Sequence, residues 1–138
     1  MTSTPAMVLQ VDAPDATYEP GDELTGQFLI KAAPHLEVRS LELSILWYTA
    51  GKGEEDMAVH HFERLVDEAE KPLDLRALHR FKTKLPVSPL SYDGQIVKIC
   101  WCARVRLFLP HGQTEVTEAA FRLGSVAPAI AEPAGPDT

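Results

Sequence analysis

Apolar residues in this 138-residue chain alternate with polar ones, and no segment keeps the 3.6-residue period of a packed α-helix. The clearest apolar row lies in residues 95–109 and consists of Val97, Ile99, Trp101, Ala103, Val105, Leu107 and Leu109. A second row lies in residues 38–49 and consists of Leu41, Leu43, Ile45 and Trp47. Successive side chains of a strand point to opposite faces, so each row predicts a half-buried strand.

Extending this pattern along the chain predicts about seven strands separated by turn residues. They cover residues 7–11, 24–32, 38–49, 58–66, 77–85, 95–109 and 114–123. Pro20-Gly21 between the first two has the chemistry of a type II turn, because proline presets the first φ and glycine permits a positive second one. Strands without a covering helix must bury their apolar rows against one another, so we expect an all-β, antiparallel β-sandwich with both Trp47 and Trp101 inside.

The pattern delimits one domain, residues 7–124, between a flexible N-terminus at 1–6 and a disordered Ala/Pro-rich tail at 125–138. No apolar run approaches the roughly 18 residues of a membrane span, and the first residues lack a secretory signal, so we expect a cytoplasmic protein. Cys100 and Cys102 are too close together for ordinary disulfide geometry and too few for a structural zinc site.

Four segments together resemble the amino-terminal domain of the arrestin superfamily over roughly residues 7–109. They are Tyr18-x-Pro20-Gly21-Asp22-x-Leu24-x-Gly26, Val38-x-Ser40-Leu41-Glu42-Leu43, Phe81-x-x-x-Leu85-Pro86-x-x-Pro89-Leu90-Ser91-Tyr92-Asp93-Gly94 and Ile99-x-Trp101-x-Ala103-x-Val105. The loop that feeds the long strand is the most specific of them. The chain looks closest to single-domain bacterial arrestin-like proteins, which are distant relatives of the sporulation-control and retromer-type members.

This resemblance implies an immunoglobulin-like, arrestin-like sandwich that is used for protein–protein contact and has no catalytic residues to carry over. Arrestins and the retromer-type members have two such sandwiches in tandem, whereas 138 residues hold one. The buried charged cluster that senses phosphate in visual-type arrestins has no counterpart in this sequence. The resemblance therefore does not imply that this chain recognises receptor tails.

The residues that could carry chemistry favour a protein without enzymatic activity, cofactor or metal. His60 and His61 have acidic neighbours, but adjacent strand residues point to opposite faces and cannot easily share one ion. No phosphate-binding glycine loop, nucleophile elbow or paired-histidine zinc motif occurs. Cys100 and Cys102 share a strand face beside Lys98 and Arg104, whose charge would lower a thiol pKa if solvent reached it. A reactive or palmitoylated pair is one interpretation; small packed side chains are the favoured one.

Charge gives the candidate partner-binding residues. The formal net charge of −7 argues against nucleic acid as a partner, yet residues 76–106 hold seven cations and a single acid. If strands 77–85 and 95–109 are neighbours, they place six cations on one face: Arg80, Lys82, Lys84, Lys98, Arg104 and Arg106. The negative charge that neutralises these cations would come from the chain's own loops at 54–56 or 67–74, from a partner segment, or from an anionic lipid surface.

We therefore expect a non-enzymatic scaffold or adaptor that binds a protein partner, with an acidic protein as one candidate, through this basic face or through an exposed edge strand. The alternative is a module that binds an anionic ligand or a membrane surface through the same cations. Peripheral contact with an anionic membrane would accompany that alternative.

Overall fold

The computed structural model of the chain describes residues 6–13, 17–31, 37–53, 55–70, 73 and 77–124. Within these residues the backbone forms nine strands and one 3-10 turn, Pro110–Gly112. The strands are β1 (Ala6–Val11), β2 (Thr17–Tyr18), β3 (Glu23–Lys31), β4 (Ser40–Gly51), β5 (Met57–Val66), β6 (His79–Lys84), β7 (Tyr92–Asp93), β8 (Val97–Phe108) and β9 (Thr114–Leu123). All seven predicted strands are present. The two additional ones have two residues each, too few to show alternation.

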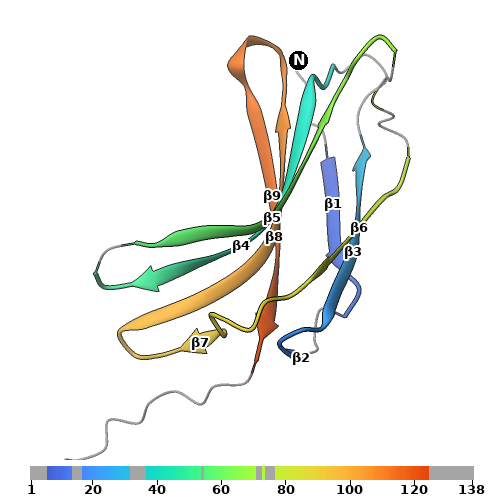
Figure 1. Cartoon of the computed structure of the whole chain (residues 1–138). Coiled ribbons are helices and arrows are strands. Elements are labelled where there is room, and N and C mark those ends of the chain that lie inside the picture. Colours follow the sequence, from blue (N-terminus) through green and yellow to red (C-terminus); the bar gives the residue numbers. More distant parts are fainter. Residues whose placement is uncertain are drawn as a thin grey trace, which may run out of the picture.

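The strands form two sheets, and Figure 1 shows the smaller one beside the strongly curled larger one. The smaller sheet has the order β1-β3-β6; the larger has the order β2-β9-β8-β4-β5, with β7 added on β8. Every pair is antiparallel except β2 with β9, where Thr17 and Tyr18 run parallel to Arg122 and Leu123. The expectation of a purely antiparallel fold is therefore wrong at this pair, which alternation could not reveal because β2 is so short.

The inner faces of the two sheets supply the core. β4 and β8 pair over their whole lengths, so their apolar rows lie side by side, and Leu41, Ile45, Ala103 and Val105 have no exposed surface. Trp101 is 1% exposed, and its Nε1–H donates a hydrogen bond to the Pro89 carbonyl at 2.8 Å. Trp47 is only half-buried and packs against the edge of the core. The expectation that both indoles are internal is confirmed for Trp101 alone.

The turn before β3 confirms the predicted chemistry. Gly21 has φ +87°, and the Asp22 N–H donates to the Glu19 carbonyl at 2.9 Å, as in a type II turn. Ala6, which was predicted to be flexible, begins β1 opposite Lys31. The rest of the predicted flexible N-terminus (1–5) and the predicted tail (125–138) lie outside the described residues. In the part of the chain that the structure describes, no helix has the length and apolarity needed to cross a membrane.

Candidate interaction surface

The six candidate cations do not share a face. β6 pairs with β3 in the smaller sheet, whereas β8 lies between β9 and β4 in the larger one. The expectation that these strands are neighbours is wrong, because alternation shows which side chains share a face of one strand but not which strands pair. Arg80, Lys82 and Lys84 lie on the exposed face of the smaller sheet; Lys98, Arg104 and Arg106 lie on the outer face of the larger one. The cations are therefore divided between two opposite outer faces.

Half of these cations have acidic partners within the chain. The ion pairs are Arg80 Nη2 with Asp12 Oδ2 at 3.1 Å, Lys98 Nζ with Asp93 Oδ1 at 3.4 Å, and Arg104 Nε with Glu118 Oε2 at 2.6 Å. None of the three acids belongs to the loops at 54–56 or 67–74 that were expected to supply them. Exposed pairs of this kind add little stability, but they reduce the positive potential that either face presents.

The largest group of exposed apolar side chains on one described strand lies instead on β5, at the edge of the larger sheet. Within the described residues, β5 pairs with β4 and with no other strand. Its ten residues include four large apolar side chains that are 43% to 58% exposed: Met57, Val59, Phe62 and Val66. Natural edge strands are usually shortened, charged or covered, since an open backbone edge accepts another strand. A long apolar edge is therefore a marker of an interaction surface.

A β-bulge aligns these four side chains. Ile45 pairs with His61 but Leu46 pairs with Val59, so β5 has one residue more than β4 at this point. Residues that pair directly share a face, and Val59 therefore lies on the outer face with Leu46, as Phe62 does with Ser44. In a regular strand Val59 and Phe62, which are three positions apart, would point to opposite faces. The bulge also explains why this strand has the weakest alternation in the sequence, which is why its apolar side chains were not predicted as a surface.

The same bulge places both histidines on the inner side. The His60 Nε2–H donates to the Lys84 carbonyl at 2.7 Å, and its ring lies edge-on to Trp101 with 6.1 Å between centroids. The His61 Nε2–H donates to the Glu63 carboxylate at 2.7 Å. The prediction that they point to opposite faces is wrong, because it assumed a regular strand. No three His, Cys, Asp or Glu side chains among the described residues are grouped so that they could hold a metal ion.

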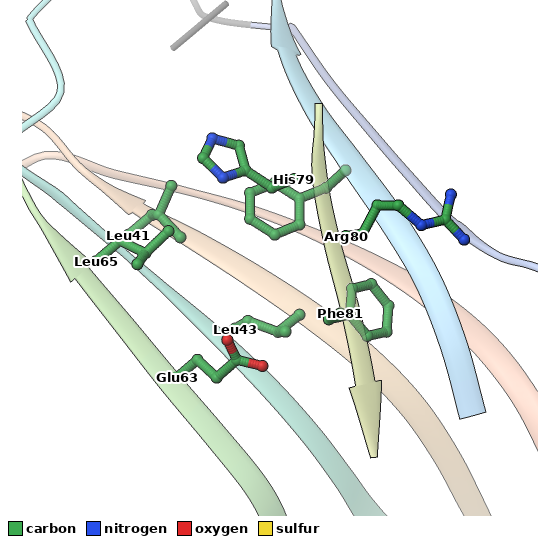
Figure 2. Close-up of a pocket in the computed structure, with 8 residues that line it drawn as sticks. Leu41, Leu43, Glu63, Leu65, His79, Arg80 and Phe81 are labelled. Atoms are coloured by element: carbon green, nitrogen blue, oxygen red, sulfur yellow. The ribbon is translucent and has the colours of Figure 1, made fainter. Parts of the chain in front are cut away.

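A cavity of about 200 Å³ lies beside β5, between the two sheets. Figure 2 shows Leu41, Leu43 and Leu65 on one side of it and the strand that carries His79 and Phe81 on the other. Phe28 completes the apolar lining, and Glu63 contributes a carboxylate that is 44% exposed. Arg80, a candidate partner-binding residue, turns its guanidinium away from the cavity. The hydrogen bond from His60 to Lys84 joins β5 to β6 along the same side of the sandwich.

The cysteines are free, with Cys100 half-buried and Cys102 buried. Burial, with a smaller contribution from the Glu118 carboxylate, raises the pKa of the Cys102 thiol to about 11, although Arg104 acts in the opposite direction. Arg104 does lower the pKa of Cys102, but the condition for an activated thiol, access to solvent, is not met there, and desolvation outweighs the cation. Arg104 is also paired with Glu118.

We predict that Cys102 behaves as a packed side chain up to strongly alkaline pH. The folded state keeps this thiol neutral, so its contribution to stability is fully present below the unfolded pKa near 9 and is lost as pH rises through about 11. In a Cys100→Ser variant, a thiol-labelling reagent at pH 8 should react only after denaturant is added. Rapid labelling of the native variant would contradict this burial.

These two packed sheets belong to the arrestin-like fold. The likeness is to Spo0M, a sporulation control protein from Bacillus subtilis, with a TM-score of 0.64 and 15% sequence identity over 91% of this chain. The match covers 51% of Spo0M, so this chain spans about half of that protein's length.

A β-glucosidase from Listeria innocua in complex with gluconolactone also matches, with a TM-score of 0.38, 16% identity, 90% of this chain and 17% of the enzyme. A likeness this weak carries no argument about activity. No protein-family model and no curated protein matches the chain.

Proposed function

We propose that this chain is a non-enzymatic protein–protein interaction module, a scaffold or adaptor with an arrestin-like fold, and that it contacts its partner through β5. The observation that carries the proposal is the row of four exposed apolar side chains on an edge strand of ten residues. Adding a strand to such an edge satisfies backbone hydrogen bonds and covers apolar surface in one step.

Comparison with the other edges favours β5. β6 presents Arg80, Lys82 and Lys84 to solvent, and charged side chains of this kind protect an edge against strand addition. β1 and β9 each have a single large exposed apolar residue, Val8 and Val116. Among these edges, β5 therefore has the longest row of exposed apolar side chains.

We also infer that the chain is an immunoglobulin-like member of the arrestin superfamily that works in a reducing compartment such as the cytoplasm. The four sequence segments that resemble the arrestin amino-terminal domain support the superfamily. Two cysteines that form no disulfide suit a reducing compartment. We further propose a bacterial origin, which rests on the sequence resemblance to single-domain bacterial arrestin-like proteins.

The proposal is tested by charging the edge. In Val59→Lys/Phe62→Lys, lysines replace two exposed apolar side chains whose burial by a partner is worth on the order of 1.5–3 kcal/mol each. Affinity capture from the source cells should then recover the wild-type partner at least about tenfold less well, since 1.4 kcal/mol is a factor of about ten. Val116→Lys is the control, because it replaces an exposed valine of the same sheet by lysine outside β5. Equal recovery by all three proteins would contradict the proposal.

The alternative, binding of an anionic ligand or membrane surface, needs the cations to act together, and their division between two faces weakens it. We expect no salt-sensitive flotation of the protein with vesicles containing phosphatidylserine. Flotation that is lost in Arg104→Glu/Arg106→Glu and retained in Val59→Lys/Phe62→Lys would establish the alternative instead.

A further inference from the structure

We propose that the partner of β5 is an extended peptide segment with basic residues at both ends and a central apolar side chain that enters the cavity between the sheets. This inference rests on the proposed function, because it describes the chemistry of the segment that β5 accepts. It follows from three features of β5: its open backbone edge, the charge around its ends, and the cavity on its inner side.

Charge decides the sign of the partner. Residues 55–70, which contain β5 and its flanks, hold six acids and one arginine, a formal charge of −5 with both histidines neutral. The acids lie mainly at the two ends of the strand: Glu55 and Asp56 before it, and Asp67, Glu68 and Glu70 after it. All five are exposed. Lysine or arginine near each end of an added strand would meet opposite charge, and an acidic segment would be repelled.

The cavity decides what the middle of the segment carries. Side chains of an added strand alternate, so one set lies over the outer row and the other points between the sheets. Glu63 and Leu65 of β5 line the cavity, which places it within reach of an inward side chain opposite them. An apolar cavity of about 150 Å³ is large enough to hold benzene. The cavity of about 200 Å³ therefore has room for a leucine or phenylalanine side chain, which would pack against its leucine and phenylalanine side chains, while Glu63 and His79 form the polar part of the lining.

Charge also argues against two occupants that the chain itself could supply. A second copy would bring its own β5, with acids at both ends, against the acids of the first. Residues 125–138 contain two acids and no base, so they have the same sign of charge as the flanks of β5. A basic segment of another protein is the occupant that charge favours.

The test uses a fluorescein-labelled probe peptide, Lys-Lys-Val-Thr-Val-Leu-Val-Thr-Lys-Lys, titrated with the full chain and followed by anisotropy. Valines are placed to face the outer row, and the central leucine is placed to face the cavity. Replacing this leucine by threonine should weaken binding about tenfold, because burial of the leucine is lost. Replacing the four lysines by glutamates should weaken binding about tenfold or more. The difference in affinity between the lysine and glutamate probes should become smaller as salt is added.

Two variants of the chain locate the binding. Leu65→Trp fills the cavity from β5 and should abolish the preference for leucine over threonine in the probe, whereas Val116→Trp, a matched control on β9, should preserve it. If Leu65→Trp does not fold, methyl NMR of the wild-type chain replaces it. The leucine probe should then shift the Leu41 and Leu43 methyl signals, and the threonine probe should not.

The outcomes separate this inference from the proposed function. If the chain binds leucine, threonine and glutamate probes equally or binds none of them, the peptide chemistry is wrong. The proposed function still stands if Val59→Lys/Phe62→Lys loses the natural partner. If the chain instead sediments as a dimer that Val59→Lys/Phe62→Lys converts to a monomer, the occupant of β5 is a second copy and this inference is overturned.

Discussion

Replacing Trp101 with alanine is expected to destabilise the domain by about 3–5 kcal/mol, the usual cost of deleting a large buried aromatic side chain. Trp101 is 1% exposed and lies 5.9 Å from Phe121 between ring centroids. Its indole N–H also holds the Pro89 carbonyl, which would lose that donor. Single domains are typically stable by about 5–15 kcal/mol, so this loss would leave a marginal fold. Urea denaturation followed by circular dichroism measures it.

Trp47→Ala is the matched control for this experiment. The same type of side chain is removed from the inward row of the neighbouring strand β4, but Trp47 is only half-buried at the edge of the core. We expect a loss well below that of Trp101→Ala. Equal losses for the two variants would mean that the core does not centre on Trp101, and the arrangement of the two sheets would then need revision.

Gly26→Val is expected to destabilise the smaller sheet by about 3 kcal/mol or more, at the upper end of what overpacking usually costs. A Cβ at position 26 would lie 2.6 Å from the Gln10 carbonyl oxygen and closer still to the ring of Phe81. Gly26 lies on the middle strand of the smaller sheet, where it pairs with Val11 of β1 on one side and with Phe81 of β6 on the other. The ring of Phe81 occupies the space that a side chain would take. Urea denaturation of the variant measures the cost.

A double-mutant cycle identifies the cause of that cost. In Gly26→Ala/Phe81→Leu, the smaller side chain at position 81 removes one of the two close contacts. The double variant should therefore be more stable than the sum of the single changes predicts, with a coupling on the order of 0.5–3 kcal/mol. Simple additivity would mean that the ring is not what excludes a side chain at position 26.

Much of the fold could be predicted from local sequence pattern. The alternation in residues 38–49 and 95–109 identified β4 and β8, because both strands have one largely buried face. Pro20-Gly21 specified its turn for a local reason, the positive φ at Gly21. The parallel pairing of β2 with β9 joins residues more than 100 positions apart, and two residues cannot signal it. Gly26 and Phe81 both belong to the segments that resemble the arrestin amino-terminal domain. Their close approach across β3 and β6 gives a physical reason why these two residue types occur together.

The candidate surface was much less predictable. Which face each cation occupies followed from alternation, but the assignment of β6 and β8 to different sheets depends on long-range pairing that the sequence does not display. The apolar row of β5 was hidden by its own bulge, since the extra residue at His60 interrupts the alternation that would have marked Val59 and Phe62 as neighbours on one face. The cavity beside Glu63 and Leu65 depends on how the two sheets pack, which no local pattern specifies.

Amide hydrogen exchange resolved by residue tests most directly whether the outer edge of β5 is open. β4 has a strand on each side, so its amides should all exchange slowly. In β5 we expect slow and fast amides to alternate on either side of the bulge, because one set bonds to β4 and the other faces solvent. Uniformly slow exchange along β5, as slow as in β4, would show that the edge is already paired and would contradict the account.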